Sequence, residues 1–433
     1  MDNYPRFSGA HAAPADWLPL SLDAATSERA SPAQRASALV IAAAALRSAP
    51  AGSLAGEPIA TLARGLASES LRACDDAAVR AQLLAVVVNA VAAAGADVAR
   101  ESENLFRVLL QLRAAEAGGL GEGEGGSERV DAGAGGGAGA AAAPRGIGLP
   151  PSESSAPARA IAALAAACGH ASGPDALFLA HASSLLSALA EEEAGWDGEC
   201  AGQRVFGALL LGAPPEVLSD DSNAAAIRKI FASTARQHRE PTLRLALLRL
   251  LDALFEDARR AAACGGVAGA LIEEVVLEGL TWRAGKTAAA VRYAAVVALG
   301  TMLRNKTVSG KALLSVIRKG DLLPSLISAM EEDYYADTRA ASAHAFRHLF
   351  LVCGDRLSDD ERRQIYPELL KRMDDSRNEI RIATCGVVAA FFETCAPDYD
   401  ETNTGYFLKA RRHPSSSLHR FPYDSVRVVN FIP

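Results

Sequence analysis

Residues 365–383, IYPELLKRMDDSRNEIRIA, carry the pattern that decides the fold. A proline opens an apolar helix, two aspartates follow the helix, and an arginine stands near the start of a second apolar helix. Residues 322–341, LLPSLISAMEEDYYADTRAA, repeat this pattern, and Pro324 and Pro367 are 367 − 324 = 43 residues apart. Proline is tolerated in the first turn of a helix, where its missing N–H has no partner. The two stretches therefore predict two copies of a proline-started helix, a turn and a second helix.

An apolar residue, an arginine and a small apolar helix recur at regular intervals over the second half of the chain. The arginines are Arg244, Arg292, Arg339 and Arg381, spaced by 292 − 244 = 48, 339 − 292 = 47 and 381 − 339 = 42 residues. An earlier copy stands at Arg80. A period in the forties built from helix pairs is typical of HEAT and armadillo solenoids. Because no strand-like alternation interrupts this pattern, we predict an all-α fold, an α-solenoid of HEAT/armadillo-type helical repeats.

The aspartates of the last two repeats suggest a role for these arginines. Asp333 and Asp375 each stand six residues before the arginine of their repeat. This arrangement resembles the HEAT signature, in which aspartates and arginines of neighbouring repeats form a ladder of hydrogen bonds. A planar guanidinium can bridge carboxylates and carbonyls in this way. We predict a structural ladder, and a direct contact with a partner protein is the alternative.

The two earlier repeats depart from the ladder pattern. Six residues before Arg292 is Lys286, and six residues before Arg244 is His238. On this spacing the acid–arginine ladder is expected only for the last two repeats.

Composition supports helices and argues against several classes of function. Half of the residues are apolar but only 6% are aromatic, and alanine and leucine, the dominant pair, favour helix. The net charge of −7 is scattered without a basic stripe, so we expect no nucleic-acid partner. Residues 1–19 lack the apolar core of a signal peptide, and the longest apolar stretches, such as 36–46, are too short to span a bilayer. These features predict a soluble, cytoplasmic protein without a membrane partner.

The seven cysteines are odd in number and form no CxxC pair. This argues against a disulfide framework and against a zinc site. We expect reduced thiols in a cytosolic protein.

Four regions follow from the composition. Residues 1–117 are expected to form an N-terminal helical, HEAT-like segment with a disordered extreme N-terminus. Residues 118–157 are expected to be a flexible Gly/Ala-rich linker, since 118–148 contain 13 glycines in 31 residues and cannot bury enough apolar surface to order themselves. Residues 158–410 are expected to carry the HEAT-repeat array. Residues 411–433 are a non-repeat tail, and our hypothesis is that this tail is an isoform or gene-model artefact.

Signals for an enzyme are weak. Gly285-Lys286-Thr287 is like the end of a phosphate-binding loop, but Leu280 stands where that loop requires glycine. His344 and His348 are four residues apart on a predicted helix, without a third metal ligand in the pattern. We therefore predict no enzymatic activity, no cofactor and no bound metal.

A closer resemblance rests on residues 359–376, DDERRQIYPELLKRMDDS, and on 380–392, 399–400 and 405–408. These stretches resemble the family of dynein axonemal assembly factor 5, a HEAT-repeat family, most closely over about residues 291–409. The resemblance implies a non-catalytic scaffold for cytoplasmic preassembly of axonemal dynein arms, with dynein chains, chaperones and other assembly factors as partners. The alternative is another HEAT adaptor, such as a transport receptor or a phosphatase scaffold.

Overall fold

The computed structural model describes residues 14–50, 53–54, 56–72, 74, 76–119, 155–197, 200–332 and 335–395. These residues form helices and connecting turns without any β-strand, which confirms the predicted all-α, helical-repeat fold. They fall into two compact units that divide between Val217 and Leu218. Most of the predicted linker, residues 120–154, and all of the tail 411–433 lie outside the described residues.

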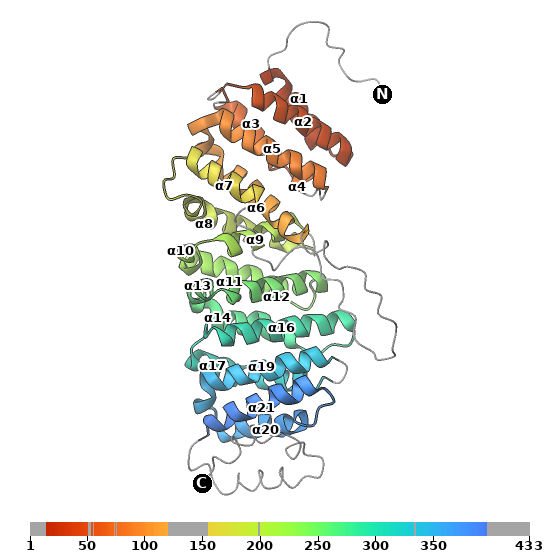
Figure 1. The fold of residues 1–433 in the computed structure, drawn as a ribbon, viewed down its shortest axis with the longest axis vertical. Helices are drawn as coiled ribbons and strands as arrows, with labels where there is room; N and C mark the ends of the chain where they lie inside the picture. Colours follow the sequence, from red (N-terminus) through yellow and green to blue (C-terminus); the bar gives the residue numbers. More distant parts are fainter. Residues whose placement is uncertain are drawn as a thin grey trace. The chain divides into compact units, whose positions relative to one another are not determined.

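The first unit contains four helix pairs among its described residues (Figure 1). Its elements are α1 (Pro14–Thr26), α2 (Pro32–Ser48), α3 (Glu57–Leu66), α4 (Glu69–Arg72), α5 (Ala77–Ala94), η1 (Gly95–Glu101), α6 (Ser102–Gly119), α7 (Ala156–Ala167), α8 (Asp175–Glu192), η2 (Glu193–Gly195) and α9 (Ala201–Gly212). The pairs are α1–α2, α3–α5, α6–α7 and α8–α9. Helix α10 (Pro215–Ser219) follows the last pair.

The described residues of the second unit also form four helix pairs. The second helices of these pairs lie side by side in Figure 1. Its elements are α11 (Asp221–Ala235), α12 (Pro241–Glu256), α13 (Ala258–Ala263), α14 (Gly265–Leu271), the π-helical turn η3 (Ile272–Val276), α15 (Leu277–Leu280), α16 (Lys286–Arg304), α17 (Gly310–Lys319), α18 (Leu322–Met330), α19 (Ala336–Cys353), η4 (Gly354–Arg356), α20 (Asp359–Arg372) and α21 (Asn378–Glu393). The pairs are α11–α12, α15–α16, α18–α19 and α20–α21. Among the second helices of these pairs, α12 packs on α16, α16 on α19, and α19 on α21. Each pair thus buries its apolar face against its neighbours, as solenoid repeats do.

An arginine marks the start of the second helix of every pair. It is the fourth residue of the helix in seven pairs, and the seventh residue of α16 in the remaining one. In chain order the eight arginines are Arg35, Arg80, Arg159, Arg204, Arg244, Arg292, Arg339 and Arg381. The repeat that the sequence shows clearly from Arg244 onward therefore runs through both units.

The Gly-rich segment joins the two helices of a single pair. Helices α6 and α7 pack against each other, and residues 120–154 connect them. The spacing of the arginines agrees, because 159 − 80 = 79, and removal of the 35 residues from 120 to 154 leaves 79 − 35 = 44. The segment is thus an insertion within a repeat.

Pro367 does not start a helix, which corrects one expectation. Helix α20 begins at Asp359, which is eight residues before Pro367. Ser358 sets this start, because its side chain forms a capping box with Glu361. Pro367 therefore lies inside the helix. Pro324, by contrast, is the third residue of α18, in its first turn.

One stretch among the described residues, 77–116, is long and apolar enough to cross a membrane by length and composition alone. The structure divides it into α5, η1 and α6 at Gly95, whose φ is +57°. Val86, Val87 and Leu109 within it are fully buried. This stretch contributes core helices to two neighbouring pairs.

Candidate functional site

Arg339 makes the most complete set of contacts in the ladder. Its Nε and Nη2 donate to the two carboxylate oxygens of Asp375, at 2.8 and 3.0 Å, and its Nη1 donates to the carbonyl of Glu332 at 2.8 Å. Glu332 lies in the turn before α19, whereas Asp375 lies in the turn of the next pair. The Arg339 and Asp375 side chains are 7% and 2% exposed. One buried guanidinium therefore fastens two successive turns together.

Arg292 and Arg244 bridge turns in the same way with different acceptors. Arg292 donates to the carbonyl of Arg283 in its own turn and to the Glu332 carboxylate in the next, at 2.6 and 2.5 Å. Arg244 donates to the carbonyls of Ala235 at 2.9 Å and Glu278 at 3.3 Å. Contacts between successive pairs thus also occur at Arg244 and Arg292, where the sequence has no aspartate six residues before the arginine and predicted no ladder.

Arg381 contacts only its own pair among the described residues. Its Nη1 donates to the carbonyl of Asp375 at 2.5 Å, and its Nη2 donates to Asn378 Oδ1 at 2.6 Å. Asp333, the remaining predicted ladder residue, lies outside the described residues. Asp375 consequently accepts from three arginine side chains, from Arg339 and Arg372 through its carboxylate and from Arg381 through its carbonyl.

Arg35 is a ladder arginine that sequence reasoning missed. It is 9% exposed, and it donates to the carbonyls of Ser27 and Ala30 before α2 and of Ser70 in the following pair. The spacing 80 − 35 = 45 was the signal that could have found it. The partners of Arg35 cannot be predicted from residue types, because all three acceptors are backbone carbonyls and every residue has one.

Burial and neighbouring positive charge act in opposite directions on the pKa of Asp375. Burial favours the neutral form of Asp375, but hydrogen bonds from Arg339 and from the Arg377 N–H, with the charges of Arg339 and Arg372, outweigh it and lower the Asp375 pKa. Burial lowers the pKa of Arg244, and Glu278 partly opposes that effect. The Asp375 carboxylate is therefore held ionised, as a structural anion.

The residues considered for enzyme chemistry lie on two helices, Lys286 on α16 and His344, His348 and Cys353 on α19. Lys286 is the first residue of α16 and is exposed, and the turn before it follows the short helix α15, where a phosphate-binding loop would follow a strand. His344 is exposed, and burial together with nearby positive charge lowers the pKa of the half-buried His348. Burial raises the pKa of Cys353 to about 12. No group of three metal-ligating side chains occurs in the described part of the chain.

One serine–histidine–glutamate cluster has the composition of a catalytic triad. His181 Nε2 is 2.9 Å from Ser102 Oγ, and His181 Nδ1 is 4.0 Å from the Glu103 carboxylate. Ser102, however, is 4% exposed and donates its hydroxyl hydrogen to the Ala99 carbonyl at 2.8 Å. A nucleophile must reach its substrate and give its proton to the base. The cluster is therefore a polar connection between α6 and α8.

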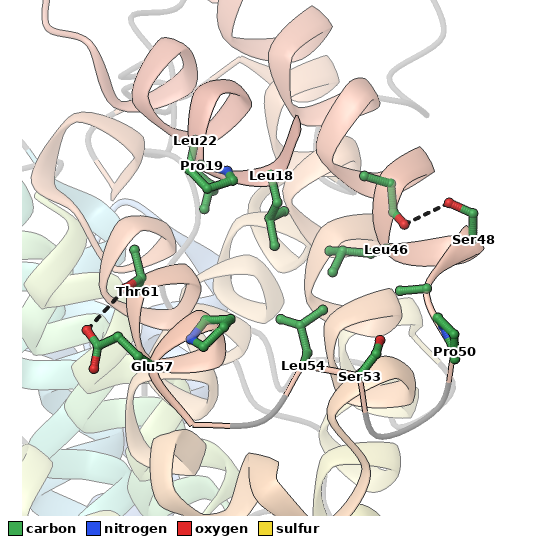
Figure 2. Close-up of a pocket in the computed structure, with 13 residues that line it drawn as sticks. Leu18, Pro19, Leu22, Leu46, Ser48, Pro50, Ser53, Leu54, Glu57 and Thr61 are labelled. Atoms are coloured by element: carbon green, nitrogen blue, oxygen red, sulfur yellow. Dashed lines mark hydrogen bonds between the residues drawn. The ribbon is translucent and has the colours of Figure 1, made fainter. Parts of the chain in front are cut away.

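A pocket in the first unit is apolar (Figure 2). It has a volume of about 480 Å³ and lies between α1, the end of α2 and the start of α3. Leucine and proline side chains dominate its walls, including Leu18, Leu22, Leu46 and Leu54. Its one carboxylate, Glu57, accepts from Thr61 and Arg64. The pocket offers apolar contact without the convergent polar groups of a small-molecule site.

Comparison with known proteins supports the resemblance drawn from the sequence. No family model matches the chain. A protein of Xenopus laevis named "Dynein axonemal assembly factor 5" is 29% identical over 53% of this chain and 27% of its own length. The proteins of the same name from Mus musculus and Homo sapiens are 25% and 27% identical over 50% and 39% of this chain. The chain thus spans about a quarter of the length of these relatives, and the partial resemblance is confirmed.

Similarity to solved structures is low. An engineered protein aligns with a TM-score of 0.41 and 14% identity, over 95% of this chain and 96% of its own. Importin beta aligns with a TM-score of 0.37 and 13% identity, over 90% of this chain and 46% of its own.

Proposed function

We propose that this chain is a non-catalytic HEAT-repeat scaffold that assists the cytoplasmic preassembly of axonemal dynein arms. The observation that carries the proposal is the match of about half the chain to relatives that share one name, dynein axonemal assembly factor 5. Its partners would be proteins, namely dynein chains, chaperones and other assembly factors.

The architecture supports a scaffold that acts through its surface. Stacked helix pairs offer long binding surfaces to large partners. The buried ladder arginines are used in joining successive turns, so they hold the surface in shape and leave recognition to exposed residues. The candidate nucleophile Ser102 is buried and its proton is engaged, which favours a role without a reaction centre.

Affinity purification of the tagged chain from the cytoplasm of ciliated cells tests this function. Mass spectrometry of the eluate should identify axonemal dynein chains together with chaperones. The matched control is the same chain carrying Arg339→Ala, which loosens the stack without changing an exposed surface, and its eluate should contain less of each specific partner.

Importin cargoes or phosphatase subunits in the eluate, in place of dynein chains, would reject the preassembly role. They would favour the alternative adaptor and leave the helical-repeat fold unaffected.

A further inference from the structure

Two neighbouring turns of the second unit expose an aromatic ring and several positive charges. The first turn, residues 236–240, connects α11 to α12, and the second, residues 281–285, connects α15 to α16. The first turn is joined to α15, the helix directly before the second turn, because Gln237 donates through its backbone N–H and its side chain to Glu278, at 3.1 and 2.7 Å. The two turns therefore belong to neighbouring parts of one edge.

Trp282 projects from this edge in a fixed position. Its side chain is 60% exposed, an unusual exposure for so large an apolar group. The guanidinium carbon of Arg292 lies 5.8 Å from the centre of the ring, and Arg292 is itself held by Arg283 O and Glu332. A cation on one face of the indole orients the ring and leaves the remainder of its surface available to a partner.

Three exposed cations belong to these two turns and to the first residue of α16. Arg236, Arg283 and Lys286 are exposed, and none of the three forms an ion pair with a described residue. Some exposed arginines of this unit are paired, as in Arg228–Glu274 and Arg304–Glu256. Lys229, Arg259 and Lys311 are exposed without an ion pair to a described residue, but each lies on a different helix. The edge thus combines an exposed aromatic ring with three cations that form no ion pair with a described residue, and Glu240 is the one carboxylate within its two turns. The chain as a whole has a net charge of −7.

The backbone of the second turn supports this arrangement. Gly285 has φ +109°, which side-chain-bearing residues rarely adopt, and it sets the direction in which the chain enters α16. Lys286 is the first residue of that helix, where the helix dipole adds to its positive charge. Trp282, Arg283 and Lys286 therefore stand where this turn joins α16.

We propose that this Trp282 edge, formed by Arg236, Trp282, Arg283 and Lys286, binds an acidic peptide segment of a partner protein. Carboxylates of the segment pair with the three cations, and an apolar side chain of the segment packs on Trp282. Tryptophan and arginine are the residues that most often dominate protein interfaces. The inference deepens the proposed function, because it rests on the chain being a protein-binding scaffold.

An acidic peptide fits better than a nucleic acid. Three cations on a negatively charged protein provide few phosphate contacts, whereas nucleic-acid surfaces carry extended basic stripes. A short peptide needs only local complementarity of charge and one apolar anchor.

Fluorescence anisotropy with the full chain tests the proposal. The probe is a fluorescein-labelled peptide of alternating glutamate and aspartate around a central leucine–phenylalanine pair. The combined variant R236E/R283E/K286E should weaken binding about tenfold or more, since reversed charges repel the probe. Trp282→Ala should weaken it by about tenfold, as expected for an interface anchor.

The matched control is K229E/R259E/K311E, which makes the same change in net charge at exposed, unpaired cations on α11, α13 and α17. It should leave the affinity within about twofold of the parent chain. Equal weakening by both triple variants, or unchanged binding by Trp282→Ala, would overturn the proposal. Stronger binding of labelled oligouridylate than of the peptide, lost in R236E/R283E/K286E, would overturn it in favour of a nucleic-acid surface.

The peptide assay and the affinity purification can reject the acidic-peptide surface and the preassembly role independently of each other. Peptide binding at the edge without dynein chains in the eluate would reject the preassembly role and keep the acidic-peptide surface. In the opposite case, no peptide binds at the edge, and the eluate of R236E/R283E/K286E contains dynein chains at the level of the parent chain. This result would reject the acidic-peptide surface and keep the preassembly role.

Discussion

At the scale of single residues, we expect the stability of the second unit to depend on Arg339. We expect Arg339→Ala to lower the free energy of unfolding of this unit by about 1.5–3 kcal/mol, the range for hydrogen bonds to charged groups. The larger penalty of an isolated buried charge does not apply, because Asp375 keeps its contacts with Arg372 and the Arg377 N–H. Chemical denaturation followed by circular dichroism measures the change.

The matched control is Arg363→Ala, on the neighbouring helix α20. The Arg363–Asp360 pair is 61% and 85% exposed, so its loss should change stability by less than about 1 kcal/mol. Equal effects of the two substitutions would contradict a structural role for the buried ladder.

Asp375 should also make stability depend on pH. Its pKa in the folded chain lies below its ordinary value of 3.8, so on acidification the unfolded chain takes up the proton first. The stabilisation is therefore complete at neutral pH and is lost as the pH falls below about 4, through the folded pKa. Asp375→Asn should be less stable than the parent at neutral pH, and the difference should shrink near pH 3 in denaturation curves. A difference that is constant over this range would show that Asp375 does not titrate in this way.

At the scale of helices, close packing distinguishes two glycines of the second unit. A Cβ at Gly279 in α15 would lie 2.8 Å from Ala295 Cβ and 3.2 Å from Leu248 Cδ1. Gly279→Ala should therefore force α15 away from its neighbours and cost about 1–3 kcal/mol. A Cβ at Gly300 in α16 meets nothing within 4 Å, so Gly300→Ala should stabilise the helix by about 0.5–1 kcal/mol.

Thermal melting of the two alanine variants measures both effects, with opposite signs expected for the shift in Tm. A rise in Tm for Gly279→Ala would mean that α15 can move outward without loss of packing.

The sequence predicts the helices of this fold better than the contacts between them. The period of the arginines is readable because each helix pair repeats the same local geometry. The acceptors are not readable, since Arg244 and Arg35 donate to backbone carbonyls that any residue supplies. Spacing also misleads at Arg292: six residues before it is Lys286, which already belongs to α16, because Arg292 is the seventh residue of its helix.

The start of α20 shows a similar limit. Pro367 was expected to open a helix, but the capping box of Ser358 and Glu361 sets the boundary at Asp359. The exposed Trp282 edge depends on contacts between different helix pairs, such as Gln237 with Glu278 in α15, which no local pattern in the sequence encodes.

At the scale of the whole molecule, nearest-neighbour stacking limits how far a perturbation spreads. In repeat arrays each pair contacts only its neighbours. Arg339→Ala should therefore accelerate hydrogen exchange in α19 and α21 and leave exchange in α2 and α5 unchanged. Faster exchange in α2 and α5 would show that the chain unfolds as a single cooperative body, and mass spectrometry of peptides resolves the two cases.

The position of residues 120–154 has a practical consequence. The segment joins α6 and α7, which pack on each other within one unit, so the two halves of that pair are also held by non-covalent contacts. A chain cleaved between these helices should remain one particle, and two separately expressed fragments that meet there should reconstitute it. This makes the insertion a natural place to split the protein into complementing parts, each of which could report on assembly when fused to half of a luciferase.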